Sequence, residues 1–281
     1  MRVMGILNLT PDSFSDGGQF DTREKAVAAG RRMFDEGAWV VDVGGESTRP
    51  GACSVPLTEE RARVLPVIRE LSRYGDVSID TTKPDVARDA IAAGARIIND
   101  TSGCLYPLAG KLAVGYVGMH RRGAPATMQD NPHYDDVVGE VFAALDRIAR
   151  NAHGYGVNDL WIDPGIGFGK NIDHNVALLR ELPKLCQRGV PVLLGVSRKT
   201  VIGALTGRTD PGDRLGGSLA AAAAAWAAGV EVIRTHDVAE TIDLITVLKA
   251  VTSPGVARSH RPSSRCPSVN QGLRHPPPDN Q

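Results

Sequence analysis

Residues 159–171 read DLWIDPGIGFGKN, so that three apolar residues run directly into a carboxylate and a glycine-rich stretch. A short apolar run bounded by proline and glycine predicts a buried strand that ends at a loop. Asp163 closes that strand, and an unpaired carboxylate in apolar surroundings is costly. We therefore expect Asp163 to have a protein partner or a ligand, and we expect the glycines to let another group approach the backbone.

The same short apolar run recurs along the chain, and segments with helical spacing separate the runs. The expected strands are residues 3–9, 39–43, 77–80, 96–99, 116–120, 160–163, 190–196 and 230–236. The expected helices are residues 21–36, a segment starting at 58, then 84–93, 134–153, 173–187, 213–228 and 239–251. Residues 101–115 leave room only for a stunted helix. Eight strands alternating with helices predict a single (β/α)8 TIM barrel of the α/β class.

A doubly wound sheet is the alternative architecture. It would usually carry a glycine-rich phosphate fingerprint after its first strand, and residues 8–18 (NLTPDSFSDGG) contain none.

Asp21 and Thr58 are the expected N-caps of the first two helices, and Pro66 is expected to kink or delay the second. We assign residues 1–252 to the barrel domain and residues 253–281, rich in serine, proline and arginine, to a disordered tail.

Composition narrows the classes of function. The 32 basic and 32 acidic residues cancel, which argues against nucleic acid as the main partner. The four cysteines form no C-x-x-C pair, so zinc fingers and disulfide frameworks are not expected and a reducing compartment fits. No apolar run reaches the roughly 18 residues of a membrane span, and the N-terminus has no signal-peptide pattern. These features predict a cytoplasmic protein with no membrane partner.

Polar side chains stand at the end of nearly every expected strand, where a barrel places its chemistry. Acids and amides end the first, third, fourth and sixth strands, whereas cations end the last two. Any one of them could simply cap a helix, but a full rim favours a binding site. The set suits a substrate with an anionic end and a polar, donor-rich end: an aspartate can accept from an amidine-like edge, and Arg and His beside an asparagine that could bind magnesium suit a diphosphate. The residues are Asn8, Asp42, Asp80, Asn99, Asp100, Met119, His120, Asp163, Ser197, Arg198, Lys199, Arg234 and His236.

Two further patterns concern loops. Residues 10–20 and 44–57 are too long for ordinary strand–helix connections and are expected to be lids over the rim. Residues 165–170 suggest a phosphate loop, but the G-x-x-x-x-G-K-[ST] motif would need glycine at Pro164 and serine or threonine at Asn171. The glycine spacing also fails the dinucleotide motif G-x-G-x-x-G.

Taken together, these motifs resemble dihydropteroate synthase, a family of pterin-binding barrels in folate biosynthesis. The resemblance runs over about residues 1–250. It is carried by segments 8–18 (NLTPDSFSDGG), 42–51 (DVGGESTRPG), 78–81 (SIDT), 98–100 (IND), 119–120 (MH), 163–170 (DPGIGFGK), 197–199 (SRK) and 234–237 (RTHD). The short segment after residue 100, Thr200 in place of a common serine, and the tail depart from the family pattern.

The resemblance implies a homodimer that condenses 6-hydroxymethyl-7,8-dihydropterin diphosphate with p-aminobenzoate, giving 7,8-dihydropteroate and diphosphate with the assistance of Mg²⁺. It implies a pterin site of Asp80, Asn99, Met119, Asp163, Phe168, Gly195 and Lys199. The diphosphate would be held by Asn8, Thr48, Arg234 and His236, with Asn8 as the metal ligand. The p-aminobenzoate site would be Phe14, Arg49, Pro50, Lys199 and Thr200.

Three residues are expected to act in the chemistry: Asp16, Asp80 and Lys199. The two aspartates would stabilise the pterin cation that diphosphate leaves behind, and the glycines after Asp163 would make room for the flat ring. A pterin-dependent methyltransferase, which uses methyltetrahydrofolate and needs no diphosphate site, is the alternative enzyme. A paralogue that binds pterin without turnover is the alternative that lacks catalysis.

Overall fold

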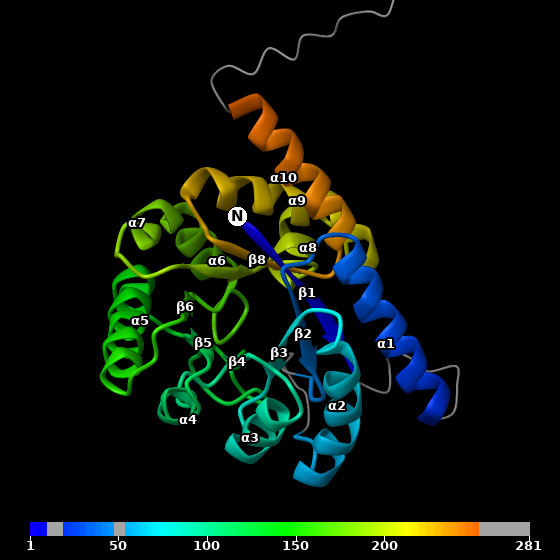
Figure 1. The fold of residues 1–281 in the computed structure, drawn as a ribbon. Helices are drawn as coiled ribbons and strands as arrows, with labels where there is room; N and C mark the ends of the chain where they lie inside the picture. Colours follow the sequence, from blue (N-terminus) through cyan, green and yellow to red (C-terminus); the bar gives the residue numbers. More distant parts are fainter. Residues whose placement is uncertain (10–18, 48–53, 253–281) are drawn as a thin grey trace, which may run out of the picture.

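The computed structural model describes residues 1–9, 19–47 and 54–252, which form a barrel of parallel strands ringed by helices (Figure 1). The strands are β1 Arg2–Asn8, β2 Val40–Gly44, β3 Asp76–Asp80, β4 Ile97–Asp100, β5 Gly115–Met119, β6 Leu160–Asp163, β7 Leu193–Gly195 and β8 Val232–Thr235. They pair in the order β6-β5-β4-β3-β2-β1-β8-β7, and a bridge between Ile162 and Val192 joins the two ends of that order. The (β/α)8 barrel predicted from the sequence is confirmed.

Side chains that alternate along the strands make two apolar layers. One side chain from each of seven strands packs into a small cluster: Met4, Val40, Ile97, Val117, Trp161, Leu193 and Val232. These residues lie toward the starts of their strands, so they fill the barrel interior below the rim. Residues of the other parity, such as Val3, Leu7 and Val41, join the larger core between strands and helices. With its lower interior filled, the barrel leaves the C-terminal strand ends for polar groups.

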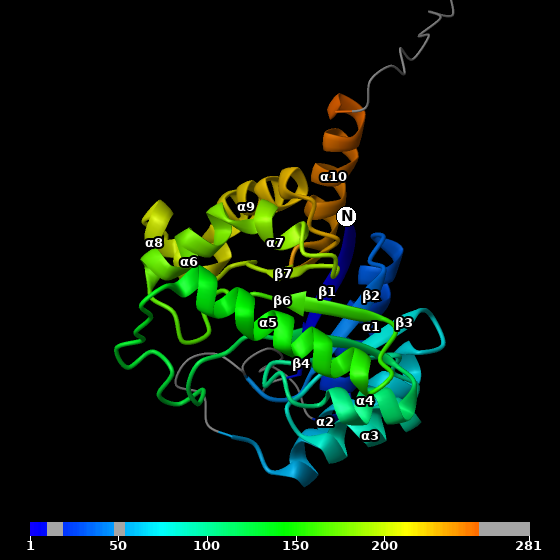
Figure 2. The ribbon, with the colours of Figure 1, turned by 90° about the vertical axis from the view of Figure 1, so that its left-hand side faces the viewer.

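The helices lie outside the strands, and in the view turned by 90° α5 runs alongside β6 (Figure 2). They are α1 Gln19–Asp35, α2 Leu57–Leu71, α3 Pro84–Ala92, α4 Tyr106–Leu112, α5 Val137–Gly154, α6 Ile172–Arg180, α7 Leu182–Cys186, α8 Thr200–Thr206, α9 Leu215–Ala228 and α10 Val238–Thr252, with a short 3-10 turn at Pro211–Arg214. The stunted helix expected after β4 is α4. In the part of the chain described here, no helix is long and apolar enough to cross a membrane.

Several expected helix boundaries were wrong. Helix α1 begins at Gln19, so Asp21 lies within its first turn instead of capping it. Helix α2 begins at Leu57 after Pro56, so Thr58 is also inside, and the helix continues through Pro66 instead of starting late. Pro183 in the first turn of α7 separates it from α6, because a proline has no N–H to donate to the carbonyl four residues before it and its ring clashes with that carbonyl. Helix α8 was missed inside a segment expected to be a connection.

Candidate active site

Four buried polar side chains from four strands lie at the C-terminal rim of the barrel. Asp42, Asp80, Asn99 and Asp163 are each at most 6% exposed. They end or nearly end β2, β3, β4 and β6, so the parallel alignment of the strands brings together residues that are far apart in the sequence. The expectation that the strand ends form one polar rim is confirmed for these residues.

Arg234 of β8 crosses the rim and joins two of these carboxylates. Its Nε donates to Oδ2 of Asp42 at 2.7 Å, and its Nη2 donates to Oδ2 of Asp80 at 2.8 Å. Nδ2 of Asn99 donates to the same oxygen of Asp42 at 2.8 Å. Asp42 therefore orients two residues of the expected substrate site. Asp42 was expected at a strand end but without a role in binding, and its place at the start of the Asp42-Val43-Gly44-Gly45 segment was the available signal.

Each of the two carboxylates keeps one oxygen without a donor. Oδ1 of Asp42 and Oδ1 of Asp80 are buried and accept no hydrogen bond within residues 1–9, 19–47 and 54–252. A buried acceptor without a donor is costly, so this pair of oxygens suits a ligand that presents N–H groups. Burial raises the pKa of Asp80 to about 7, although the Arg234 guanidinium opposes that rise.

A second polar group surrounds Gly195 at the end of β7. A Cβ atom on Gly195 would lie 3.7 Å from Oδ2 of Asp163 and 3.8 Å from Nζ of Lys199, so only glycine leaves open space between them. Burial raises the pKa of Asp163, and the Lys199 ammonium lowers it. Burial also lowers the pKa of Lys199 to about 8, against the pull of Asp163. Asp163 as an acceptor and Lys199 as a donor therefore face the same space at Gly195.

Lys199 also lies against the aromatic ring of Phe168. Its Nζ donates to the carbonyl oxygen of Ile166 and lies 4.8 Å from the ring centroid of Phe168. Phe168 is half-buried, and Met119 at the end of β5 is buried beside Gly165. The residues expected to hold a flat ring therefore lie around one region of the rim, with apolar faces next to polar edges.

Two of the three glycines after Asp163, Gly165 and Gly169, allow close contact with other backbone, which corrects for these two the expectation that the glycines make room for a flat ring. Gly165 and Gly169 have positive φ values of 68° and 63°. A Cβ atom on Gly165 would lie 1.9 Å from the carbonyl oxygen of His120, and one on Gly169 would lie 2.0 Å from that of Arg122. The close approach is thus between two segments of the chain. In addition, the N–H of Gly165 donates to Oδ1 of Asp163 at 2.7 Å and fixes that carboxylate.

Lys170 holds this loop from inside and does not face a phosphate. It is 2% exposed, and its Nζ donates to the carbonyl oxygens of Gly165 at 2.9 Å and Phe168 at 3.1 Å. It also lies 3.0 Å from Nδ1 of His120. Burial, and then the charge of Lys170, lower the pKa of His120 to about 3, so that its ring is neutral and can accept from the ammonium. The rejection of a phosphate loop agrees with this geometry.

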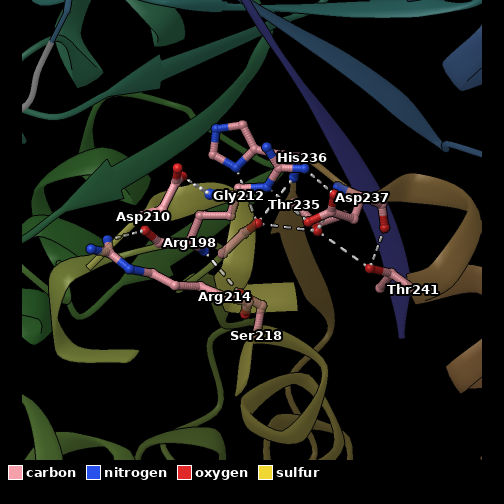
Figure 3. Close-up of polar contacts among 10 residues, drawn as sticks. Arg198, Asp210, Gly212, Arg214, Ser218, Thr235, His236, Asp237 and Thr241 are labelled. Atoms are coloured by element: carbon pink, nitrogen blue, oxygen red, sulfur yellow. Dashed lines mark hydrogen bonds and ion pairs between the residues drawn. The ribbon is translucent and has the colours of Figure 1, made fainter. Parts of the chain in front are cut away.

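Two of the residues expected at the diphosphate, His236 and Asn8, have defined neighbours at the rim. Nδ1 of His236 is 3.0 Å from Oγ of Ser197, and the backbone N–H of His236 donates to the same oxygen at 3.2 Å; His236 is drawn in Figure 3. A Cβ atom on Gly44 would lie 3.7 Å from Oδ1 of Asn8 and 3.5 Å from Cβ of Asp80. Asn8 is therefore close to Asp80, at the boundary between the two halves of the site.

The remaining expected residues are less well placed or lie outside the described parts. Thr200 is exposed at the start of α8. Within the described ranges, no three histidine, cysteine or acidic residues form a metal-binding group. Phe14, Asp16, Thr48, Arg49 and Pro50 lie outside the described residues.

The chain is similar to known proteins over most of its length. Residues 4–236 match a family described as pterin binding enzyme. The dihydropteroate synthase of Escherichia coli strain K12 is 44% identical over 260 residues, which cover 90% of this chain and 92% of the relative.

Two solved structures of Xanthomonas albilineans dihydropteroate synthase are also similar. The one with 4-aminobenzoic acid superimposes with a TM-score of 0.84 at 49% identity, covering 90% of this chain and 94% of that chain. The one in complex with 7,8-dihydropteroate has a TM-score of 0.82 at 46% identity and the same coverage.

Proposed function

This chain belongs to the family of pterin binding enzymes, as a transferase of the dihydropteroate synthase type in folate biosynthesis, and from that premise we propose how its residues carry the reaction. The substrates are a dihydropterin that bears a diphosphate and p-aminobenzoate. One observation carries the assignment of the pterin site: Asp42 and Asp80 each keep a buried acceptor oxygen at the rim that has no donor among the described residues. The dihydropterin ring has a further N–H away from its amidine-like edge, and this group supplies a donor that such oxygens lack.

The pterin lies between the two polar groups of the rim. Asp163 accepts from the amidine-like edge of the ring, and Asn99, oriented by Asp42, both donates and accepts beside it. Lys199 donates to the ring beside Asp163, across the space at Gly195. Met119, Phe168 and Gly195 pack against the flat faces of the ring and keep water away from them.

Arg234, His236 and Thr48 hold the diphosphate, whose negative charge must be neutralised before it can leave. Asn8 would supply a protein oxygen for Mg²⁺, an ion that commonly binds through one or two protein ligands and the phosphates of a substrate. When bound, the metal adds positive charge at the leaving oxygens. Arg234 adds a guanidinium already fixed by Asp42 and Asp80, so no reorganisation is needed during the reaction.

The reaction breaks one bond and forms one. The carbon–oxygen bond between the pterin methylene and diphosphate breaks, and both electrons leave with the diphosphate. Asp80, together with Asp16, stabilises the methylene cation that remains. The amine nitrogen of p-aminobenzoate then forms the carbon–nitrogen bond and loses one proton. That amine is a weak nucleophile, so the residues Phe14, Arg49, Pro50, Lys199 and Thr200 contribute mainly by positioning it.

The direct test measures diphosphate release by the purified chain with the pterin diphosphate and Mg²⁺. We expect release only when p-aminobenzoate is added, together with dihydropteroate formation. Asp163→Asn should abolish pterin binding and turnover with an unchanged melting temperature. Asp159→Asn is the matched control, because Asp159 is an exposed aspartate beside the other end of β6. Wild-type turnover by Asp163→Asn would contradict the assignment of that site.

The same assay separates the alternatives. A methyltransferase would consume methyltetrahydrofolate and release no diphosphate. A paralogue without catalysis would bind the pterin diphosphate and leave it intact.

A homodimer in the cytoplasm is our further expectation, supported by the family resemblance. Light scattering of the purified chain gives its mass, and a monomer at micromolar concentration would contradict the dimer.

A further inference from the structure

Arg198 has an unusual backbone between two residues of the site. Its φ is +57°, in the left-handed region, where a residue with a Cβ atom is strained. Such a conformation persists only where the surroundings hold it, and it often occurs at functional sites. Arg198 follows Ser197 and precedes Lys199, and all three belong to the segment between β7 and α8.

The surroundings hold Arg198 by its backbone and by its side chain (Figure 3). Its N–H donates to Oγ of Ser218 at 2.9 Å, and its carbonyl oxygen accepts from Nη1 of Arg214 at 2.9 Å. Oγ of Ser218 in turn donates to the carbonyl oxygen of Arg214 at 2.8 Å. The guanidinium pairs with both carboxylate oxygens of Asp237, with its Nε 3.1 Å from Oδ2. The side chain is thus paired with Asp237, the residue after His236.

The turn at Arg198 places Ser197 and Lys199 in different parts of the rim. Before it, Ser197 meets Nδ1 of His236 at 3.0 Å. After it, Lys199 reaches the carbonyl oxygen of Ile166 and the ring of Phe168. Ser197 therefore contacts the segment after β8, and Lys199 contacts the segment after β6.

Ser197 can orient His236 for an anion. Its Oγ accepts the backbone N–H of His236 at 3.2 Å, so its own proton is available to Nδ1 of the same histidine. A neutral imidazole that accepts at Nδ1 carries its proton on Nε2, where it can donate to a phosphate oxygen.

We propose that Arg198 is a positioning residue, whose held left-handed backbone directs Ser197 toward His236 in the diphosphate half and Lys199 into the pterin half. The proposal rests on the function proposed above for those two halves. Arg198 itself contacts no substrate. Its effect on the reaction comes through the placement of its neighbours.

Two substitutions separate the backbone from the guanidinium. Arg198→Ala and Arg198→Gly both lose the Asp237 pair, but only glycine adopts positive φ without strain. Because a displacement of about 1 Å can cost a hundredfold in rate, we expect Arg198→Ala to lower kcat/KM for the pterin diphosphate by about a hundredfold. We expect Arg198→Gly to recover about tenfold of that loss, since its backbone can keep the turn.

The chain offers matched controls. Arg188→Ala removes another two-point Arg–Asp pair, with Asp146, on the surface beside α5, and should leave kcat and both KM values unchanged. Ala113→Gly relieves another left-handed residue, at the end of α4, and should also leave the kinetics unchanged. If Arg198→Ala melts lower but keeps wild-type kcat and KM, Arg198 is only structural and the proposal fails. Equal losses in the alanine and glycine variants would also overturn it.

Crystal structures of the two variants test the positions of Ser197 and Lys199 without any measurement of activity. The glycine variant should keep the Ser197–His236 and Lys199–Ile166 contacts, and the alanine variant should lose at least one of them. If both contacts persist in Arg198→Ala, the inference is overturned. Absence of dihydropteroate formation by the wild-type chain would instead overturn the proposed function, and the crystallographic result would still decide the role of Arg198.

Discussion

Nη2 of Arg234 lies 2.8 Å from Oδ2 of Asp80, so a cation at the end of β8 is paired with an acid at the end of β3. Arg234 is expected to hold the leaving diphosphate, and Asp80 is expected to stabilise the cation left behind. The contact therefore connects the two halves of the site directly. In the proposed reaction, the guanidinium would stay next to this carboxylate after the diphosphate leaves.

The ionisation of Asp80 and Lys199 predicts a narrow pH optimum. Burial raises the pKa of Asp80 to about 7, so turnover should rise through pH 7 as this carboxyl loses its proton. Burial lowers the pKa of Lys199 to about 8, so turnover should fall above pH 8 as the ammonium loses its proton. A profile of kcat/KM against pH measures both limbs. Lys199→Arg should lack the alkaline limb at lower activity, and an unchanged limb in that variant would contradict the assignment.

Lys170→Met should destabilise the protein by about 3 kcal/mol at pH 7, because buried carbonyl groups of the loop lose their donor. Burial lowers the pKa of Lys170 in the folded chain to about 7 from 10.5. The unfolded chain therefore binds more protons between these values, and this residue makes stability rise as the pH increases from 7 to 10.5.

Urea unfolding at pH 7 and pH 10 tests both statements for Lys170→Met. The rise that Lys170 contributes should be absent from the variant. Lys184→Met is the control, because its side chain is 73% exposed and its loss should change stability by less than about 0.5 kcal/mol. A Lys170 variant as stable as this control would show that the buried ammonium does not hold the loop.

Gly165 and Gly156 have similar backbone conformations but differ in the room available for an added Cβ atom. Both glycines have positive φ, 68° and 83°, so alanine should cost each about 1 kcal/mol of strain. At Gly156 nothing lies within 4 Å of the added Cβ atom, whereas at Gly165 the atom would meet the carbonyl oxygen of His120. We expect Gly165→Ala to lose more than about 3 kcal/mol, measured by thermal unfolding. Similar melting temperatures would contradict the close approach.

Lys83 joins two acids at the border of the second long loop. Its Nζ donates to Oε2 of Glu60 at 2.6 Å and to the carbonyl oxygen of Val55 at 2.7 Å, and it also pairs with Glu46. Glu60 is 1% exposed, so Lys83→Met leaves a buried carboxylate without its cation and should cost about 3 kcal/mol.

Glu60→Gln provides the partner variant for Lys83. Removing the charge of Glu60 in the Lys83→Met background should recover about 1 kcal/mol or more, because the unpaired ion is gone. Urea unfolding of the two single variants and the double variant measures the coupling. If the double variant loses the sum of the two single losses, the two residues act independently.

Local patterns were enough for the strands and for the rim. The apolar run before Asp163 predicted β6 with the bounds that the structure has, and the polar residues after other runs predicted where the rim would be. Helix starts were less predictable. Asp21 and Thr58 have suitable side chains for N-caps, yet the structure begins each helix earlier, after Gly18 and Pro56.

The sequence alone determined the architecture, because strand periodicity and the residues at strand ends are local properties of the chain. Only the closed barrel decided which rim residues contact each other. Arg234 and Asp42 are 192 residues apart and meet because β8 and β2 both flank β1. The roles of Gly165 and Arg198 also depend on distant segments, His120 for one and Ser218 for the other. No local pattern records such contacts, since their distances are set by the packing of all eight strands.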